Sequence, residues 1–129
     1  MLNVLIDTDV LIDHLRGLDQ AKQFLRERKE AGDMLHCSTI SRAEIFAGVR
    51  PKEEPLISAL LSILKAVPID EKIAEQAGLY CRQYARSHSL LLPDALVAAS
   101  AKSVDATLVT LNRKHFPMKD ISVLMPYKR

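Results

Sequence analysis

The chain begins with a short apolar run, and apolar residues then recur at helical spacing. Residues 2–6 form a nearly continuous apolar segment, which is typical of a strand buried in a parallel sheet. The apolar positions between residues 10 and 15 predict a helix, and Gly17 is expected to end it. A second amphipathic helix is predicted to follow, with Asp19 as its N-cap.

The middle of the chain alternates in the same way between extended and helical patterns. Residues 34–38 predict a second strand, and residues 41–49 predict a short helix that begins at Ser41. Residues 53–66 carry an apolar stripe at helical spacing, so a helix is predicted over that whole range. After a brief extended piece, Asp70 is predicted to cap a long helix with a clear period of 3.6 residues.

The last third adds one more helix and two more strands. Pro93 and Asp94 favour a helix start, and the small residues that follow would let this helix lie close to a sheet. Residues 107–110 predict a strand, and residues 121–124 predict an edge strand. Strands that alternate with helices in one short chain predict a single α/β domain over residues 1–129, with a mainly parallel sheet.

Composition and charge narrow the class of protein. The chain has 129 residues, of which 48% are hydrophobic and 26% charged, so it has a globular rather than a disordered profile. A net charge of +2 argues against a protein whose main task is to coat nucleic acid. Cys37 and Cys81 are expected to be buried free thiols. The sequence shows neither a signal peptide nor an apolar run near the ~20 residues that span a membrane, so a cytoplasmic location is expected.

The acidic residues gather where the predicted strands end. In parallel α/β sheets, ligands bind at the carboxyl ends of the strands. The polar residues at or near this edge are Asp7, Asp9, Glu44, Asp94, Thr110 and Asn112. Several carboxylates at one edge would repel each other, and a hard divalent cation relieves that repulsion. Such a cation lowers the pKa of a bound water, which points to hydrolytic chemistry.

Each acid also has a purely structural explanation. Ser41 and Glu44 have the spacing of a capping box, and Asp94 could complement a helix dipole. Asp7 or Asp9 could cap the first helix. The four histidines have no zinc-binding spacing with the cysteines, and the four glycines form no phosphate-binding loop. The shared placement of the acids, rather than any one of them, therefore carries the prediction.

Four segments resemble the motifs of PIN-domain proteins, in the same order and at similar spacing. These segments are Ile6–Asp13, Ser41–Val49, Pro93–Ala101 and Leu108–Phe116. The length also matches the VapC-type toxins of toxin–antitoxin pairs. The resemblance implies a PIN-like three-layer sandwich, with a mainly parallel sheet between helices, and the activity of a metal-dependent endoribonuclease.

The resemblance also implies roles for the acids. Asp7, Glu44 and Asp94 would hold Mg²⁺ or Mn²⁺, and a metal-activated water would hydrolyse an RNA phosphodiester bond. Asn112 stands where the family often has a fourth acid and could still position a water. The expected supporting residues around the metal ligands are Thr8, Asp9 and Thr110.

The resemblance further implies a cognate antitoxin protein. The antitoxin would lie over the site and insert an Arg or Lys into the acidic pocket. The exposed side of the first two helices, around Leu11, Leu15 and Arg16, is the expected docking groove. No membrane partner is expected.

A homodimer is also implied, and with it a toxin–antitoxin hetero-oligomer. The helices predicted at 53–66 and 70–87 are the expected contact elements. Tyr80, Tyr84 and Leu56 are candidates for this face, with core packing as the alternative.

Other function classes remain open at this stage. Asp7 and Asp9 have the Asp-x-Asp form of haloacid-dehalogenase phosphatases, but no acid pair follows a later strand. A receiver-like module would need a phosphoacceptor Asp at the end of a middle strand, where Asp70 reads as a helix cap. A PIN-like protein that binds RNA or a partner without cutting is a further alternative. The reason to consider it is Asn112, which stands where the family often has a fourth acid.

Placing four acids in one pocket changes the meaning of the net charge. Outside Asp7, Asp9, Glu44 and Asp94, 18 basic residues face 12 acidic ones. The exterior is thus expected to be basic around a concentrated acidic site. A near-neutral total is therefore compatible with an RNA substrate.

Overall fold

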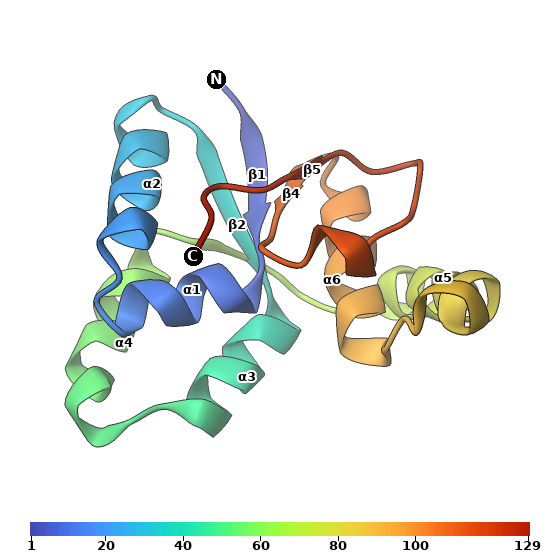
Figure 1. Cartoon of the computed structure of the whole chain (residues 1–129), viewed down its shortest axis with the longest axis horizontal. Helices are drawn as coiled ribbons and strands as arrows, with labels where there is room; N and C mark the ends of the chain where they lie inside the picture. Colours follow the sequence, from blue (N-terminus) through green and yellow to red (C-terminus); the bar gives the residue numbers. More distant parts are fainter.

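The computed structural model describes residues 1–129 and places every strand in one sheet (Figure 1). The strand order is β3-β2-β1-β4-β5, and all neighbouring strands pair in parallel. The strands are β1 (Asn3–Ile6), β2 (Met34–Ser38), β3 (Lys65–Val67), β4 (Thr107–Val109) and β5 (Val123–Leu124). The predicted parallel α/β architecture is confirmed.

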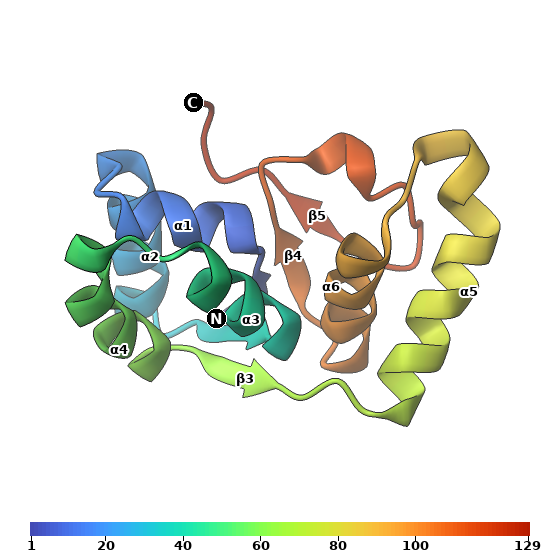
Figure 2. The same ribbon diagram turned by 90° about the horizontal axis from the view of Figure 1, so that it is seen from below.

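Helices cover both faces of this sheet. They are α1 (Thr8–Leu15), α2 (Asp19–Glu30), α3 (Thr39–Gly48), α4 (Glu54–Ser62), α5 (Glu71–His88) and α6 (Leu92–Ser103). Two 3₁₀ turns, η1 (Pro51–Glu53) and η2 (Arg113–His115), complete the regular structure. Figure 2 shows α1, α2 and α4 grouped on one side, and α5 and α6 together on the other. The result is a three-layer sandwich.

The first strand is the centre of the molecule. Val4, Leu5 and Ile6 are completely buried, because β1 has strand neighbours on both sides and helices on both faces. Val4 and Ile6 belong to the apolar cluster that contains α1, α2 and α4, whereas Leu5 belongs to the cluster that contains α5 and α6. This alternation follows the two-residue period of a strand.

Small side chains let α6 approach the sheet. Ala95, Ala98, Ala99 and Ala101 are all buried on this helix. Helix α5 packs against its outer side and continues the same apolar cluster through Ile73, Ala77 and Tyr80. Close packing of α6 holds its first turn beside the carboxyl edge of the sheet.

One predicted helix was too long. Residues 53–66 do not form a single helix: η1 precedes α4, which ends at Ser62, and β3 begins at Lys65. The apolar stripe of this segment is real, since Ile57 and Leu60 are buried. The chain must leave the helix, however, because Lys65 pairs with His36 of β2 at the end of the sheet.

Two predicted N-caps were also wrong. Leu18 precedes α2 without any side-chain cap, and Asp19 is the first helical residue. Helix α3 begins earlier than predicted, with Ser38 as its N-cap, and Ser41 lies inside it with no exposed surface. The predicted cap of the long helix is correct, because Asp70 accepts a hydrogen bond from the Ile73 N–H at 2.9 Å.

None of the helices combines the length and the apolar composition that would be needed to cross a membrane. Cys37 is buried as expected, whereas Cys81 is only partly buried, and both thiols are free.

Replacing Leu5 by Ala tests the central role of β1. Leu5 is completely buried between both neighbouring strands and the α5–α6 layer, so the change removes apolar burial and leaves a cavity. We expect the free energy of unfolding to fall by about 3 kcal/mol, measured by urea denaturation. Leu79→Ala is the matched control, because Leu79 is 48% exposed on α5. Equal losses in the two variants would contradict this account of the core.

Candidate active site

Asp7 lies directly beyond the central strand. Its backbone N–H donates to the Val109 carbonyl at 2.8 Å, so the β1–β4 ladder extends to this residue. One carboxylate oxygen, Oδ1, accepts from the Thr8 N–H at 2.8 Å and makes Asp7 the N-cap of α1. The other, Oδ2, accepts from the Thr110 hydroxyl at 2.7 Å. Both oxygens are therefore fixed, and only 6% of the residue is exposed.

Thr8 links this position to Glu44 on α3. The Thr8 hydroxyl donates to Glu44 Oε1 at 2.7 Å and lies 2.8 Å from the Ser41 hydroxyl. Thr8 and Ser41 are buried, and Glu44 is half-buried. Glu44 therefore turns toward α1 instead of capping its own helix, which excludes the capping-box interpretation. The role of Ser41 was missed, because its spacing to Glu44 imitates a cap.

Asp94 reaches the same edge from the first turn of α6. Its Oδ2 lies 3.5 Å from Nδ1 of His115, which is on η2. Sequence reasoning considered the histidines only as zinc ligands and so missed this contact of His115. The only available signal was its position three residues after Asn112, in the segment that follows β4.

Asp9 and Asn112 are hydrogen-bonded to each other. Asp9 Oδ2 accepts from the Leu111 N–H at 3.0 Å and from Asn112 Nδ2 at 3.2 Å. The Asn112 N–H in turn donates to the Thr110 hydroxyl at 3.1 Å. These bonds hold the segment after β4 against α1, which keeps Thr110 in place beside Asp7.

The shared environment of the acids changes their pKa values. Burial raises the pKa of Asp7 to about 7; the Asp9 charge and, less strongly, the Asp94 charge add to this rise, whereas the bonds from Thr110 and Thr8 oppose it. Burial also raises the pKa of Asp94, and His115 and Glu44 shift it in opposite directions. The charge of Asp94 thus acts on Asp7, and the charge of Glu44 acts on Asp94, so Asp94 links these acids into one acidic unit.

This acidic unit has the donor chemistry of a hard-cation site, although it is open. No three His, Cys, Asp or Glu side chains are placed so that together they could hold a metal ion. Mg²⁺ usually takes only one or two protein carboxylates directly and keeps several waters, so it does not need three such side chains. Asp7, Glu44 and Asp94 supply only oxygen atoms, and a cation would offset the repulsion that raises the pKa of Asp7.

Several residues expected at the antitoxin groove and at the homodimer face are buried. Leu11 has no exposed area and Leu15 has 5%, because both pack in the core beside β1, so only Arg16 of that predicted groove is exposed. Tyr80 is 3% exposed and donates its hydroxyl to Asp120, which favours the alternative of core packing. Leu56 is exposed as predicted for a contact face, and Tyr84 is partly buried.

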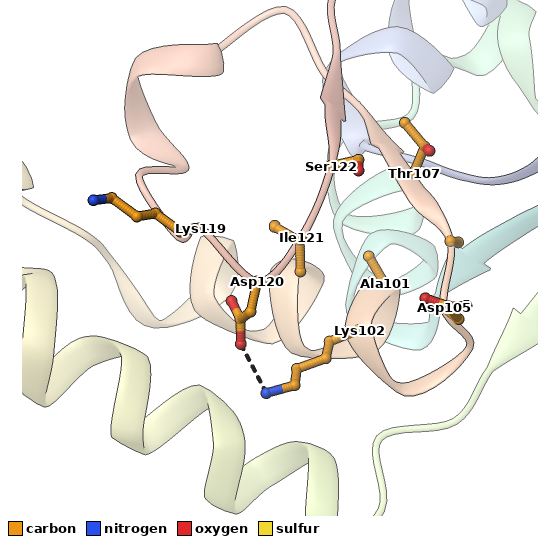
Figure 3. Close-up of a pocket in the computed structure, with 9 residues that line it drawn as sticks. Ala101, Lys102, Asp105, Thr107, Lys119, Asp120, Ile121 and Ser122 are labelled. Atoms are coloured by element: carbon orange, nitrogen blue, oxygen red, sulfur yellow. Dashed lines mark hydrogen bonds and ion pairs between the residues drawn. The ribbon is translucent and has the colours of Figure 1, made fainter.

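A second polar hollow lies at the opposite edge of the sheet, where β4 and β5 begin (Figure 3). It has a volume of about 470 Å³, and its charged side chains are Lys102, Asp105, Lys119 and Asp120. Asp120 forms an ion pair with Lys102 at 2.7 Å, and Lys119 extends away from them. Because Asp120 is paired with Lys102 and Asp105 is its only other acid, this hollow lacks the acid cluster found at the carboxyl edge.

Comparisons with known proteins agree with this geometry. The PIN domain pattern matches residues 4–121. Ribonuclease VapC10 of Mycobacterium tuberculosis is 42% identical over 116 residues, which cover 89% of this chain and 86% of that protein. Ribonuclease VapC19 of the same organism is 40% identical over 115 residues, covering 88% and 92% of the two chains.

Solved structures give the same result for the fold. A chain of a toxin–antitoxin complex from Klebsiella pneumoniae superposes with a TM-score of 0.79 and 31% identity, covering 98% of this chain and 99% of that one. A chain of the DNA-bound VapBC structure from Salmonella typhimurium has a TM-score of 0.80 at 19% identity, covering 96% and 98%. With a matched sequence pattern, close relatives and a common fold, the chain belongs to the PIN-domain family.

Proposed function

We propose that this protein is a metal-dependent endoribonuclease that acts as the toxin of a toxin–antitoxin pair. One observation carries the proposal: β1, α3 and α6 bring Asp7, Glu44 and Asp94 to one edge of the sheet, where the charge of Asp94 acts on Asp7 and that of Glu44 acts on Asp94. The relatives named as VapC ribonucleases support the same activity.

Asp7, Glu44 and Asp94 would hold the Mg²⁺ or Mn²⁺ ion. When bound, such a cation activates a water for attack on phosphorus and neutralises charge that develops on the phosphate. Thr110 and the Thr8 N–H fix the two oxygens of Asp7, while the Thr8 hydroxyl fixes Glu44. These bonds set the direction of the acid oxygens before substrate arrives, so little reorganisation is needed during hydrolysis.

The remaining polar residues have positioning roles in this proposal. Asp9 and Asn112 hold the segment that carries Thr110, and Asn112 is proposed to act through this contact. His115 lies at the rim beside Asp94, where its imidazole offsets part of the acid's charge. A neutral Asn at position 112 is therefore compatible with catalysis, because its amide is the group that pairs with Asp9.

We also propose an antitoxin partner and a cytoplasmic site of action. Several structural neighbours are chains of toxin–antitoxin complexes, which supports a protein that covers the acidic site. A cationic side chain inserted between the acids would compete with a metal ion for the same charges. A homodimer is proposed as well, with exposed Leu56 on α4 as a candidate contact.

Replacing Asp94 by Asn tests the proposed activity. The change removes one charge from the acidic unit and keeps the shape of the side chain, so we expect the rate of RNA cleavage to fall at least about a hundredfold. Cleavage of labelled RNA is measured with Mg²⁺ or Mn²⁺ and again with EDTA, which should abolish it.

Asp105→Asn is the matched control for this change. Asp105 is exposed near the opposite edge of the sheet, and Asn tolerates its left-handed backbone (φ 52°). This control is expected to cut RNA at the wild-type rate. Full activity of Asp94→Asn would contradict the role proposed for Asp94. No cleavage by the wild type with either metal would favour the non-cleaving alternative instead.

The raised pKa of Asp7 predicts a pH-dependent change in stability. The carboxyl has a pKa of about 7 in the folded protein and an ordinary value of 3.8, so the metal-free fold loses stability as the pH rises from about 4 to 7. Asp7→Asn removes this loss, because Asn can still accept from Thr8 and can donate to Thr110. We expect a gain in unfolding free energy of about 2–4 kcal/mol at pH 8.

Urea denaturation in EDTA at pH 5 and pH 8 measures this effect. The gain should be smaller at the lower pH, where the folded wild type already carries a proton on Asp7. Added Mg²⁺ should stabilise the wild type more than Asp7→Asn. An equal or larger gain at pH 5 would show that burial does not hold the Asp7 proton as described.

A further inference from the structure

The last residues of the chain are tied to α1. After β5 the chain crosses the sheet toward this helix (Figure 1). The Tyr127 hydroxyl donates to Asp13 Oδ2 at 2.8 Å. Arg129 donates to the same carboxylate through two atoms, Nε to Oδ2 and Nη2 to Oδ1, both at 3.0 Å. This two-point contact fixes both the position and the plane of the guanidinium.

The contacts of the last residues with Asp13 border a hollow of about 540 Å³ beside α1. The residues that line it are Asp13, Arg16, Gly17, Leu18, Gln20 and Arg129. Asp13 is its only acid, and its carboxylate already accepts the bonds from Tyr127 and Arg129. The side chains of Arg16 and Arg129 are 44% and 58% exposed. The hollow therefore presents two cations, and its only acid is already bonded.

The two arginines keep donors for a further ligand. Arg129 uses two of its five N–H groups on Asp13. Arg16 directs Nε toward Glu53 Oε2 at 3.8 Å, which is an ion pair without a short hydrogen bond. Planar guanidinium groups with free donors match the oxygens of a phosphate group.

The hollow is a neighbour of the acidic site. Asp13 follows Asp9 by four residues on α1, which is one turn and about 6 Å along the helix axis. Arg129 is bonded to Asp13 and therefore lies about one helical turn beyond Asp9. Helix α1 thus leads from the acids at its first turn to the arginines at its far end.

We propose that the hollow between Arg16 and Arg129 binds a backbone phosphate of the RNA strand that the acidic site cuts. This inference rests on the proposed ribonuclease function. An RNA strand continues beyond the bond that is cleaved, so its neighbouring phosphates must lie on adjacent surface. The acids repel those phosphates, and the fixed cations at the other end of α1 attract them.

The position of the hollow favours RNA over an acidic protein segment. A protein partner could dock on any exposed face, whereas a substrate strand must pass the surface next to the acids. The hollow at the opposite edge of the sheet is different, because the acid cluster of the carboxyl edge does not lie beside it (Figure 3). Lys119 in that hollow is exposed and serves as a control for a general effect of positive charge.

Binding of RNA without cleavage tests the proposal. A fluorescein-labelled single-stranded RNA of about ten nucleotides is titrated with protein in EDTA, and fluorescence anisotropy gives the Kd at several salt concentrations. The double variant Arg16→Gln/Arg129→Gln should bind about tenfold more weakly than the wild type, and its slope of log Kd against log salt should fall by about 1. Lys119→Gln should change neither quantity.

Tyr127→Phe tests the contact between the last residues and Asp13 separately from the charges of the two arginines. It removes one bond to Asp13 and leaves both arginines, so its salt slope should equal that of the wild type. Thermal melts confirm that each variant is folded. A double variant with wild-type Kd and salt slope would overturn the proposal. So would a double variant that loses affinity for polyglutamate but retains its affinity for RNA, since the hollow would then serve a protein.

Failure of the proposed function has a different signature. In that case the wild type neither binds the labelled RNA nor cuts it with Mg²⁺ or Mn²⁺, and the inference falls with the function. If the wild type cuts RNA and the double variant keeps its affinity, only the phosphate site is wrong.

Discussion

Desolvation of the Asp7 carboxyl is the constraint around which the molecule is organised. The residue follows a strand that has neighbours on both edges and helices on both faces, so water cannot solvate its charge. Two hydrogen bonds, from Thr110 and from the Thr8 N–H, replace only part of that hydration, and the pKa stays near 7. A group held in this state binds a proton or a cation readily. The fold therefore keeps a buried, poorly solvated carboxyl at which a bound metal ion can replace the missing hydration.

Two further acids on α1 support this arrangement through their hydrogen bonds. Asp9 holds the segment after β4, and Asp13 holds the last residues of the chain. They are four residues apart, so they lie on one face of the helix. A single short helix thus begins at the acidic site and fastens two distant segments along its length. The same device explains why Asn112 suits this chain, since its amide donates to Asp9, whereas a carboxylate there would repel it.

Much of the architecture follows from the sequence, because buried strands and amphipathic helices leave strong periodic patterns. The acids at the strand ends were found by that logic, and β1, β2 and the cap at Asp70 follow from local pattern alone. The errors share a cause. The end of α4 is set by pairing of Lys65 with a strand far away in the chain, and the contacts of Ser41 and His115 cross between elements. Local pattern carries no information about such partners.

The central position of the first strand has a consequence for biosynthesis. Asp7 is made well before its partner Thr110, which lies 103 residues further along the chain. At about 5–20 residues per second, a ribosome needs several seconds to connect the two. Until then the nascent chain has no β4 to complete the centre of the sheet, and Asp7 remains hydrated and ionised. Each growing chain therefore carries unassembled acids until the residues of β4 and Thr110 have been made.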